Sequence, residues 1–284
     1  MISNIEVIYG LANRSFPYGL KKTISDPDEL PLEKILKTFD GVDGAEKYKW
    51  SKNDINYLKI SKKICNFTKI DINDYQIENV IKVIKKHSSE EGSIYLKGLY
   101  IHNEISEEIL KIYNSFRPII KDKFGLKLGF SIYKQEEIDF LIRNEVDFEI
   151  LQIPRNINVN LDVSKLQARG CEIYLRSIFL QGAYFANLTN KFNKNITEKI
   201  DKQKKYLTLE AESLKLTLGE YLFSEAISAC IINNYKGIVI GSSSLDRLNS
   251  YFTNYKNVNI FDRNSLEISD IIDTYLADPR QWKV

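Results

Sequence analysis

The chain has 284 residues, 43% of them hydrophobic, and a formal net charge of +2. This length fits one large domain or two small ones, and the apolar fraction is sufficient for a buried core. A charge so close to zero gives no electrostatic reason to expect nucleic acid or a membrane surface as a partner.

The three cysteines, Cys65, Cys171 and Cys230, are far apart and odd in number. This pattern favours free, buried thiols in a reducing compartment over a disulfide scaffold. The sequence contains no apolar run as long as a transmembrane helix, and its N-terminus lacks the pattern of a signal peptide. We therefore expect a cytoplasmic protein.

Short apolar runs recur along the chain, and most are followed by a polar stretch of helical period. The predicted strands lie, in chain order, at residues 5–10, 39–43, 57–64, 95–102, 127–133, 148–154, 171–179 and 237–244. The predicted helices lie at residues 75–89, 106–116, 134–144 and 219–234, and the last of these is the longest. The strand at 39–43 is the weakest, and only about a dozen residues separate it from the next one, too few for a full helix.

Strands that alternate with helices indicate a mostly parallel sheet, and eight strands are the number of a (β/α)8 barrel. We predict an α/β fold of this kind, a TIM barrel with a shortened second β/α unit, as one domain over residues 1–284. The alternative is an open doubly wound sheet. The absence of a Gly-rich turn after the first strand argues against a dinucleotide-binding version of that sheet.

Four reactive side chains follow three successive predicted strands. Asp43 and Tyr48 follow the second strand, Lys63 ends the third and His102 ends the fourth. In an α/β barrel, the carboxyl ends of the strands form the active-site face. Each residue also has an ordinary explanation: a surface turn for Tyr48, solvation for Lys63 and a helix cap for His102. Their joint occurrence at neighbouring strand ends favours a catalytic set.

The chemistry of these four residues suits the reduction of a carbonyl group. The oxygen that becomes an alkoxide needs an acid, and a tyrosine with an ordinary pKa of about 10 is a weak donor near neutrality. A cation beside the phenol, here Lys63, lowers that pKa, and Asp43 would keep the cation charged and in place. His102 would hydrogen-bond the carbonyl and orient it.

Lys63 is preferred to its neighbour Lys62 because successive side chains of a strand point to opposite faces. In the predicted strand, Lys62 shares its face with three aliphatic residues, whereas Lys63 shares its face with polar ones. Lys63 would therefore point into the barrel.

Several segments carry a family resemblance. The run Asp43-Gly44-Ala45-Glu46-Lys47-Tyr48, the lysine of ISKKI and the run Ile101-His102-Asn103 resemble the Asp-Thr-Ala-x-x-Tyr, Ser/Thr-Thr-Lys and Leu-His-Asn/Asp motifs of the aldo/keto reductase family. The segments LGFSIY, LQIPRN, LRSIFLQGAYF and VIGSSSLDRL resemble its later strands. The opening YGLANRSFPYG resembles a bacterial branch of the family that is associated with surface-polysaccharide clusters.

The resemblance implies an enzyme, an oxidoreductase that uses NADPH, with NADH a weaker alternative, and a small polar or carbohydrate-derived carbonyl substrate. It implies no metal and leaves the oligomeric state open. The residues it assigns to the nicotinamide end of the cofactor are Ser131, Gln152, Asn156, Arg176, Ser177 and Phe179. Those it assigns to the phosphate end are Gly241, Ser242, Ser243 and Arg247, although SSSLDRL also fits a helix N-cap followed by a solvated arginine.

The sequence also departs from the family pattern. Gly44 stands where the family has threonine, and Arg14 and Ser15 replace a phenylalanine and a glycine of the opening segment. Arg176 occupies the place where many relatives have an aromatic ring that stacks on nicotinamide, so either Arg176 or Phe179 could take that role. The alternative function is a catalytically silent barrel that binds nucleotide or a partner and regulates.

Overall fold

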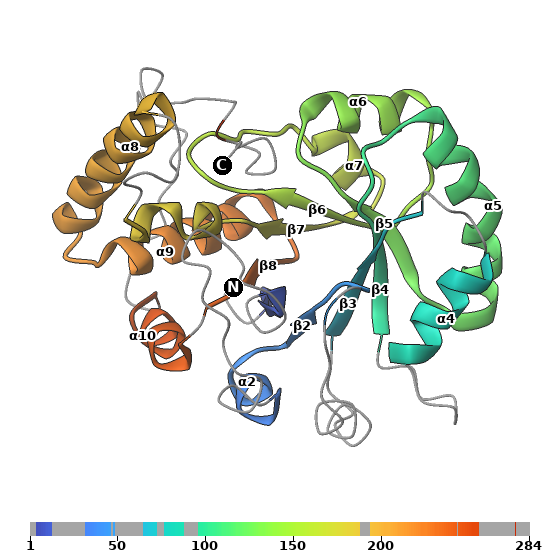
Figure 1. The fold of residues 1–284 in the computed structure, drawn as a ribbon, viewed down its shortest axis with the longest axis horizontal. Helices are drawn as coiled ribbons and strands as arrows, with labels where there is room; N and C mark the ends of the chain where they lie inside the picture. The colour runs from blue at the N-terminus through green and yellow to red at the C-terminus, as the bar shows by residue number, and fades with distance from the viewer. Residues whose placement is uncertain are drawn as a thin grey trace.

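Eight parallel strands form a closed barrel in which each strand pairs with the next one along the chain and β8 pairs with β1 (Figure 1). The structure is a computed structural model, which describes residues 4–12, 32–46, 48, 65–72, 77–87, 96–187, 194–242, 244–255 and 276. The strands are β1 (Glu6–Gly10), β2 (Gly41–Asp43), β3 (Cys65–Ile70), β4 (Leu96–Ile101), β5 (Lys127–Ser131), β6 (Ile150–Pro154), β7 (Glu172–Arg176) and β8 (Gly237–Ile240). The predicted TIM-barrel fold is confirmed, and the open doubly wound sheet is excluded.

The predicted third strand was wrong. We expected it at residues 57–64, which lie outside the described residues, whereas β3 is Cys65–Ile70. The error arose because β3 reads CNFTKI, in which polar residues separate the apolar ones, so it contains no apolar run of the kind by which we located strands. The connection after β2 therefore spans residues 44–64, longer than the dozen or so residues that we expected, and most of it lies outside the described residues, so the expected lack of a full helix there stays a prediction.

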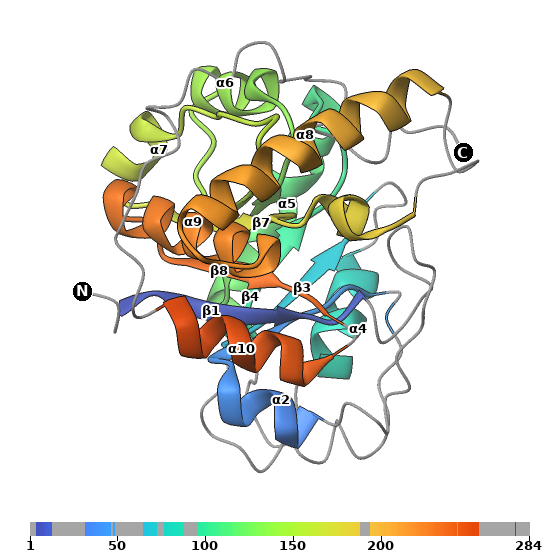
Figure 2. The ribbon, with the colours of Figure 1, turned by 90° about the vertical axis from the view of Figure 1, so that its left-hand side faces the viewer.

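Helices pack around the outside of the barrel (Figures 1 and 2). The helices are α2 (Leu32–Thr38), α4 (Ile77–His87), α5 (Glu107–Phe124), α6 (Gln135–Arg143), α7 (Ser164–Ala168), η2 (Leu180–Phe185), α8 (Lys194–Ser213), α9 (Leu218–Asn233) and α10 (Leu245–Tyr255). The four predicted helices correspond to α4, α5, α6 and α9. The prediction that the last would be the longest was wrong, because α8 has 20 residues and α9 has 16.

Local signals explain where α5 begins and ends. The Ser106 side chain accepts a hydrogen bond from the backbone of Ile109 at the N-terminus, and Gly125 ends the helix in the left-handed conformation (φ 63°). Acidic residues occupy its first turn and basic residues its last, which favours the helix dipole at both ends. The helix thereby fixes the connection from β4 to β5.

Helix α9 is buried on almost its whole circumference, because it lies between β8 and the helices α8 and α10 (Figure 2). Its N-terminus carries a capping box in which Thr217 and Glu220 bind each other's backbone N–H groups. A helix that is apolar all round is typical of such a buried position. This packing supports β8, whose end carries the residues expected to bind phosphate.

The lower half of the barrel interior, where the strands begin, is closed by ion pairs and aromatic residues. Lys97 Nζ donates to Glu6 Oε1 at 2.8 Å, and the Tyr174 hydroxyl donates to Glu6 Oε2 at 2.8 Å. Above them, a small cluster of buried side chains fills the centre: Ile8, Tyr100, Ile150, Tyr174 and Val239. This packing leaves the carboxyl ends of the strands as the end of the barrel where a cavity can form.

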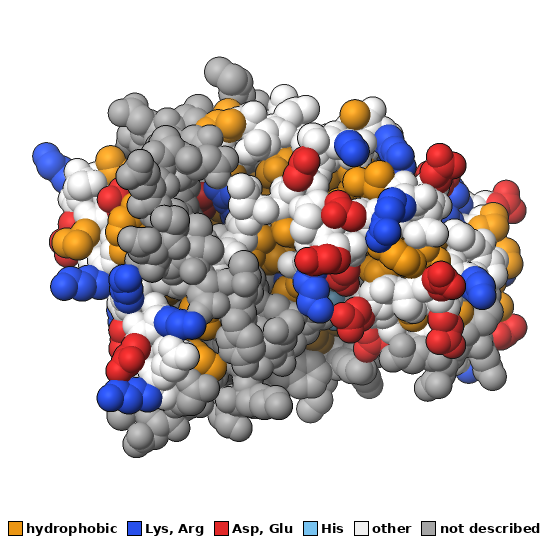
Figure 3. Space-filling view, turned by 90° about the horizontal axis from the view of Figure 1, so that it is seen from above, with side chains coloured by type: hydrophobic (Ala, Val, Ile, Leu, Met, Phe, Trp, Pro, Cys, Tyr) orange, Lys and Arg blue, Asp and Glu red, His pale blue; other side chains and the backbone are white. Residues whose placement is uncertain are grey.

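No helix in the described part of the chain is long and apolar enough to span a bilayer. On the face shown in Figure 3, acidic and basic side chains are interspersed over the described surface. Cys171 and Cys230 are free and buried, as expected, whereas the side chain of Cys65 lies outside the described ones. Burial raises the pKa of the Cys171 thiol to about 12, so this thiol stays protonated at neutral pH.

Gly129 in β5 is required by a close approach between strands. A methyl group on this residue would overlap the backbone carbonyl of Ile150 in the neighbouring strand β6. We expect Gly129→Ala to lower the free energy of unfolding by about 3 kcal/mol, because the backbone must shift to relieve the overlap. Gly10→Ala is the matched control, since its methyl group would lie 3.4 Å from Val239, an ordinary contact. Urea unfolding of both variants checks this, and equal stability of the two would contradict it.

Candidate active site

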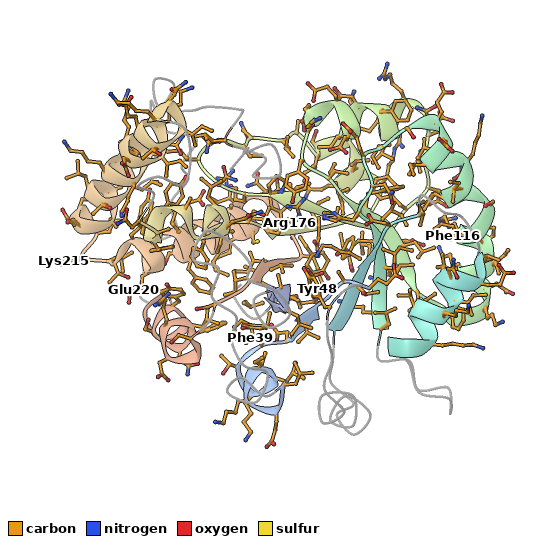
Figure 4. The ribbon with its side chains drawn as sticks, viewed as in Figure 1. Phe39, Tyr48, Phe116, Arg176, Lys215 and Glu220 are labelled. Atoms are coloured by element: carbon orange, nitrogen blue, oxygen red, sulfur yellow. The ribbon has the colours of Figure 1, made fainter. Side chains whose placement is uncertain are left out.

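A cavity of about 330 Å³ opens at the carboxyl ends of the barrel strands. Its walls come from the ends of β1, β2, β3, β4, β7 and β8, from the loop after β7 and from α10. Of the residues proposed from the sequence, those that line it are Asp43, Tyr48, His102, Arg176, Ser177, Phe179, Gly241, Ser242 and Arg247. Figure 4 labels Tyr48 and Arg176, which both lie toward the middle of the barrel.

A buried ion pair joins the ends of β2 and β3. The Lys69 ammonium group donates to Asp43 Oδ2, and Gln152 Nε2 from β6 donates to the other carboxylate oxygen at 2.9 Å. The side chains of Lys69 and Asp43 are only 10% and 5% exposed. Burial lowers the pKa of Lys69 below its ordinary value and the charge of Arg176 adds to this, while the Asp43 carboxylate opposes the shift.

Lys69 therefore stands at the strand end where Lys63 was expected. Lys63 lies outside the described residues, and the error follows from the misplaced third strand. A signal for Lys69 was present in the sequence. Thr68 and Lys69 match the Thr-Lys pair of the family motif, which neither Lys62 nor Lys63 does, because a serine and a lysine precede them.

The segment after β2 is held against β3, and this fixes Tyr48. The backbone N–H of Lys69 donates to Gly44 O at 3.2 Å, and that of Glu46 donates to Lys69 O at 2.9 Å. The chain then turns, with the Tyr48 N–H donating to Ala45 O at 2.9 Å. Tyr48 is therefore in a turn, but the turn places its half-buried ring at the cavity that Lys69 also lines.

His102 follows β4 and lines the same cavity. Its backbone N–H donates to Ile70 O at 3.0 Å, and its Nδ1 lies 3.4 Å from the backbone oxygen of Ser131. These contacts tie the imidazole to the ends of β3 and β5. The structure thus brings Asp43, Tyr48, Lys69 and His102 to one wall of the cavity.

Arg176 ends β7 and is held rigidly. Its Nε donates to Ser131 Oγ at 3.1 Å, one terminal nitrogen to Ser177 Oγ at 3.1 Å and the other to Ile132 O at 2.8 Å. The guanidinium carbon lies 3.8 Å from the centre of the Tyr133 ring, a stacked cation–π contact. The side chain is 7% exposed.

Phe179 lines the cavity in the loop after β7 and packs against Phe185 and Tyr251 with ring centres 5.8 Å apart in both cases. This loop is strained, because Ser177, Leu180 and Gln181 have φ angles of 59°, 46° and 52°. Left-handed conformations of residues other than glycine are costly and concentrate at functional sites. Both Arg176 and Phe179 therefore face the cavity, from a wall whose backbone conformation is unusual.

The end of β8 leads into α10. The Tyr9 hydroxyl donates to Ser242 O at 2.6 Å, and the backbone N–H of Ser244 donates to Ser242 Oγ at 3.1 Å. Ser244 Oγ in turn accepts from the Arg247 N–H at 3.3 Å, so a serine does cap this helix. Arg247 is exposed at the rim of the cavity, and Ser243 lies outside the described residues.

Three residues assigned to the cofactor do not belong to the described lining of the cavity. Ser131 accepts from Arg176, Gln152 donates to Asp43, and Asn156 Oδ1 accepts from the Asn158 N–H at 3.0 Å. All three are almost completely buried. Asn156 Nδ2 has no hydrogen-bond partner in the described part of the structure and so retains a donor.

Solved structures of other proteins have the same fold. The chain shares its fold with solved aldo-keto reductases. One is the holo form of AKR11C1 from Bacillus halodurans, with a TM-score of 0.67 and 14% identity over 97% of this chain and 95% of that one. An aldo/keto reductase from Brucella melitensis has a TM-score of 0.60 and 18% identity over 95% and 94% of the two chains. One from Klebsiella pneumoniae in complex with NADPH has a TM-score of 0.58 and 10% identity over 98% and 94%.

No protein-family model matches the sequence, and no curated protein matches it. Identities this low establish a common fold and leave the chemistry to be argued from the residues of the cavity.

Proposed function

We propose that the protein is an NADPH-dependent reductase of aldehydes or ketones, with Tyr48 as the proton donor. The observation that carries the proposal is the buried Lys69–Asp43 pair in the wall of a cavity that Tyr48 and His102 also line. Burying a charged pair is expensive, and an apolar pair would fill the same place at lower cost. A site for acid catalysis would explain why the Lys69–Asp43 pair is retained despite this cost. The shared fold with aldo-keto reductases, including NADPH complexes, supports the same interpretation.

NADPH, when bound, supplies the hydride that adds to the carbonyl carbon. The substrate oxygen would accept a hydrogen bond from His102 and the proton of the Tyr48 hydroxyl, and Tyr48 would recover its proton from solvent. The Lys69 ammonium favours the tyrosinate that is left behind, because a nearby cation stabilises an anion in a site of low dielectric. Asp43 keeps Lys69 charged, and Gln152 fixes Asp43.

The residues at the rim fit the phosphate end of NADPH. Ser242 and Ser244 lie at the N-terminus of α10, where backbone N–H groups and the helix dipole favour an anion. Arg247 is in the first turn of this helix, at the edge of the cavity, and its guanidinium can grip a phosphate with two parallel hydrogen bonds. At the other end, Asn156 Nδ2 has no hydrogen-bond partner among the described residues, but Asn156 is buried outside the cavity lining, so its contact with the carboxamide stays a prediction.

The silent-barrel alternative loses its main support. It rested on a shortened connection after β2 and on Gly44 in place of threonine. The connection runs from residue 44 to residue 64, and the carbonyl of Gly44 pairs with the backbone of Lys69. Both observations agree with a catalytic barrel. The substrate class, including any link to carbohydrates or surface polysaccharides, remains part of the proposal.

Tyr48→Phe removes only the proton donor. We expect kcat to fall by about 10² to 10⁴, the usual contribution of a positioned acid, while the Kd for NADPH stays within about twofold. Steady-state assays with a panel of aldehydes and fluorescence titration with NADPH measure the two quantities. Turnover at the wild-type rate would refute the assignment of Tyr48.

Lys69→Met tests the corrected position of the lysine, with Lys63→Met as its matched control. We expect Lys69→Met to lose almost all activity and Lys63→Met to keep it. The remaining activity of Lys69→Met should persist to higher pH than that of the wild type, because a tyrosine without its cation loses its proton at higher pH. Rates measured from mild acid to mild alkali test this. An active Lys69→Met variant beside an inactive Lys63→Met variant would return the catalytic role to Lys63.

Arg247→Ala tests the phosphate grip. We expect it to weaken NADPH by about 1.5–3 kcal/mol, the contribution of hydrogen bonds to a charged group, and to leave NADH nearly unchanged. Titration of both cofactors measures the difference. Equal weakening of NADPH and NADH would show that Arg247 does not contact the 2′-phosphate.

A further inference from the structure

Arg176 carries a buried positive charge with no carboxylate partner among the described residues. Its hydrogen bonds go to two hydroxyl oxygens and one backbone carbonyl, all of them uncharged. Asp43 is the only carboxylate in the described lining of the cavity, and its ion pair is with Lys69. A buried charge that lacks an opposite charge is costly, so its retention calls for an explanation in terms of a ligand.

Arg176 starts across the barrel from Lys69, and its guanidinium group reaches over to Ser131 and Ile132 at the end of β5. Lys69 ends β3 and Arg176 ends β7, and three strands lie between these two on either side of the closed ring of eight. A carbonyl that accepts a proton from Tyr48 must lie at the wall of Lys69 and His102. The nicotinamide ring must touch that carbonyl to pass a hydride, so it must occupy the same cavity, which Arg176 also lines.

We propose that Arg176 makes the site discriminate between the two redox states of the cofactor, favouring NADPH over NADP+. This inference rests on the proposed function. The two forms share every phosphate, sugar and base, and differ by the positive charge on the oxidised nicotinamide ring. The fixed charge of Arg176 repels the oxidised ring and leaves the reduced ring unaffected. Unit charges about 7 Å apart at an effective dielectric constant of about 20 alter a binding constant by more than tenfold.

The same charge has a consequence for turnover. The ring becomes positive as the carbonyl is reduced, so NADP+ is formed next to a cation that cannot move away. The hydrogen bonds of Arg176 to Ser131, Ser177 and Ile132 hold it there. Repulsion then speeds the release of NADP+, a step that often limits kcat. An aromatic ring at this position would have the opposite effect, since its face attracts a cation.

The experiment compares the Kd values of NADPH and NADP+ by calorimetry for the wild type, Arg176→Met and Arg176→Lys. In the wild type the ratio of the Kd of NADP+ to that of NADPH should be at least about tenfold. In Arg176→Met it should fall about tenfold, toward unity. Arg176→Lys keeps the charge and should keep the ratio within about threefold. Using a ratio cancels any loss that both forms share through a displaced Ser131.

Arg247→Met is the matched control, because it removes a second arginine from the same cavity but one that faces the phosphate end. It should weaken both forms equally and leave the ratio unchanged. An unchanged ratio in Arg176→Met, with both forms still bound, would overturn the inference alone. So would an unchanged ratio accompanied by a KM that rises only for carboxylate-bearing aldehydes, which would assign Arg176 to the substrate. Failure of the wild type to bind either form would overturn the proposed function and the inference together.

Discussion

The ion pair between Lys69 and Asp43 is the interaction on which the rest of the candidate site depends. It links β2 to β3, and the bond from Gln152 to Asp43 extends this link to β6 on another side of the barrel. The backbone of Lys69 also forms hydrogen bonds with Gly44 and Glu46, in the segment that leads to Tyr48. One residue therefore holds the carboxylate with its side chain and the tyrosine segment with its backbone, so the position of β3 sets the geometry of the whole wall.

This arrangement explains why the barrel interior changes character along its axis. The middle is filled by aliphatic and aromatic side chains, as a packed core requires. The upper layer instead holds Asp43, Lys69, Gln152 and Arg176, all buried or nearly so. Buried charges of this kind contribute little net stability, because desolvation offsets their attraction. In the proposed function, the polar layer would carry the catalytic groups, and the apolar layer beneath it would supply the stability.

The sequence predicted much of the fold because most strands carry clear apolar runs. Asp43, Tyr48 and His102, which were predicted because each follows such a run, line the same cavity. Lys69 was missed because its strand has no such apolar run. Asn66, Thr68 and Lys69 interrupt the apolar residues of its strand, so CNFTKI lacks the apolar run that identified the others. Helix α8 was not predicted, because it is rich in charged residues and buries only a narrow face. The left-handed residues after β7 have no signal in the sequence, since serine, leucine and glutamine rarely adopt that conformation.

The two cations of the upper layer are not equivalent, and the difference follows from their partners. Asp43 neutralises Lys69, so beyond the immediate contact this pair acts as a dipole whose effect falls off quickly. Arg176 has only uncharged partners among the described residues, and its field therefore extends further across the cavity. Carbonyl reduction moves negative charge from the nicotinamide ring to the substrate oxygen. In the proposed reaction, the local dipole beside the oxygen would assist the proton transfer, whereas the Arg176 cation would act on the charge of the ring.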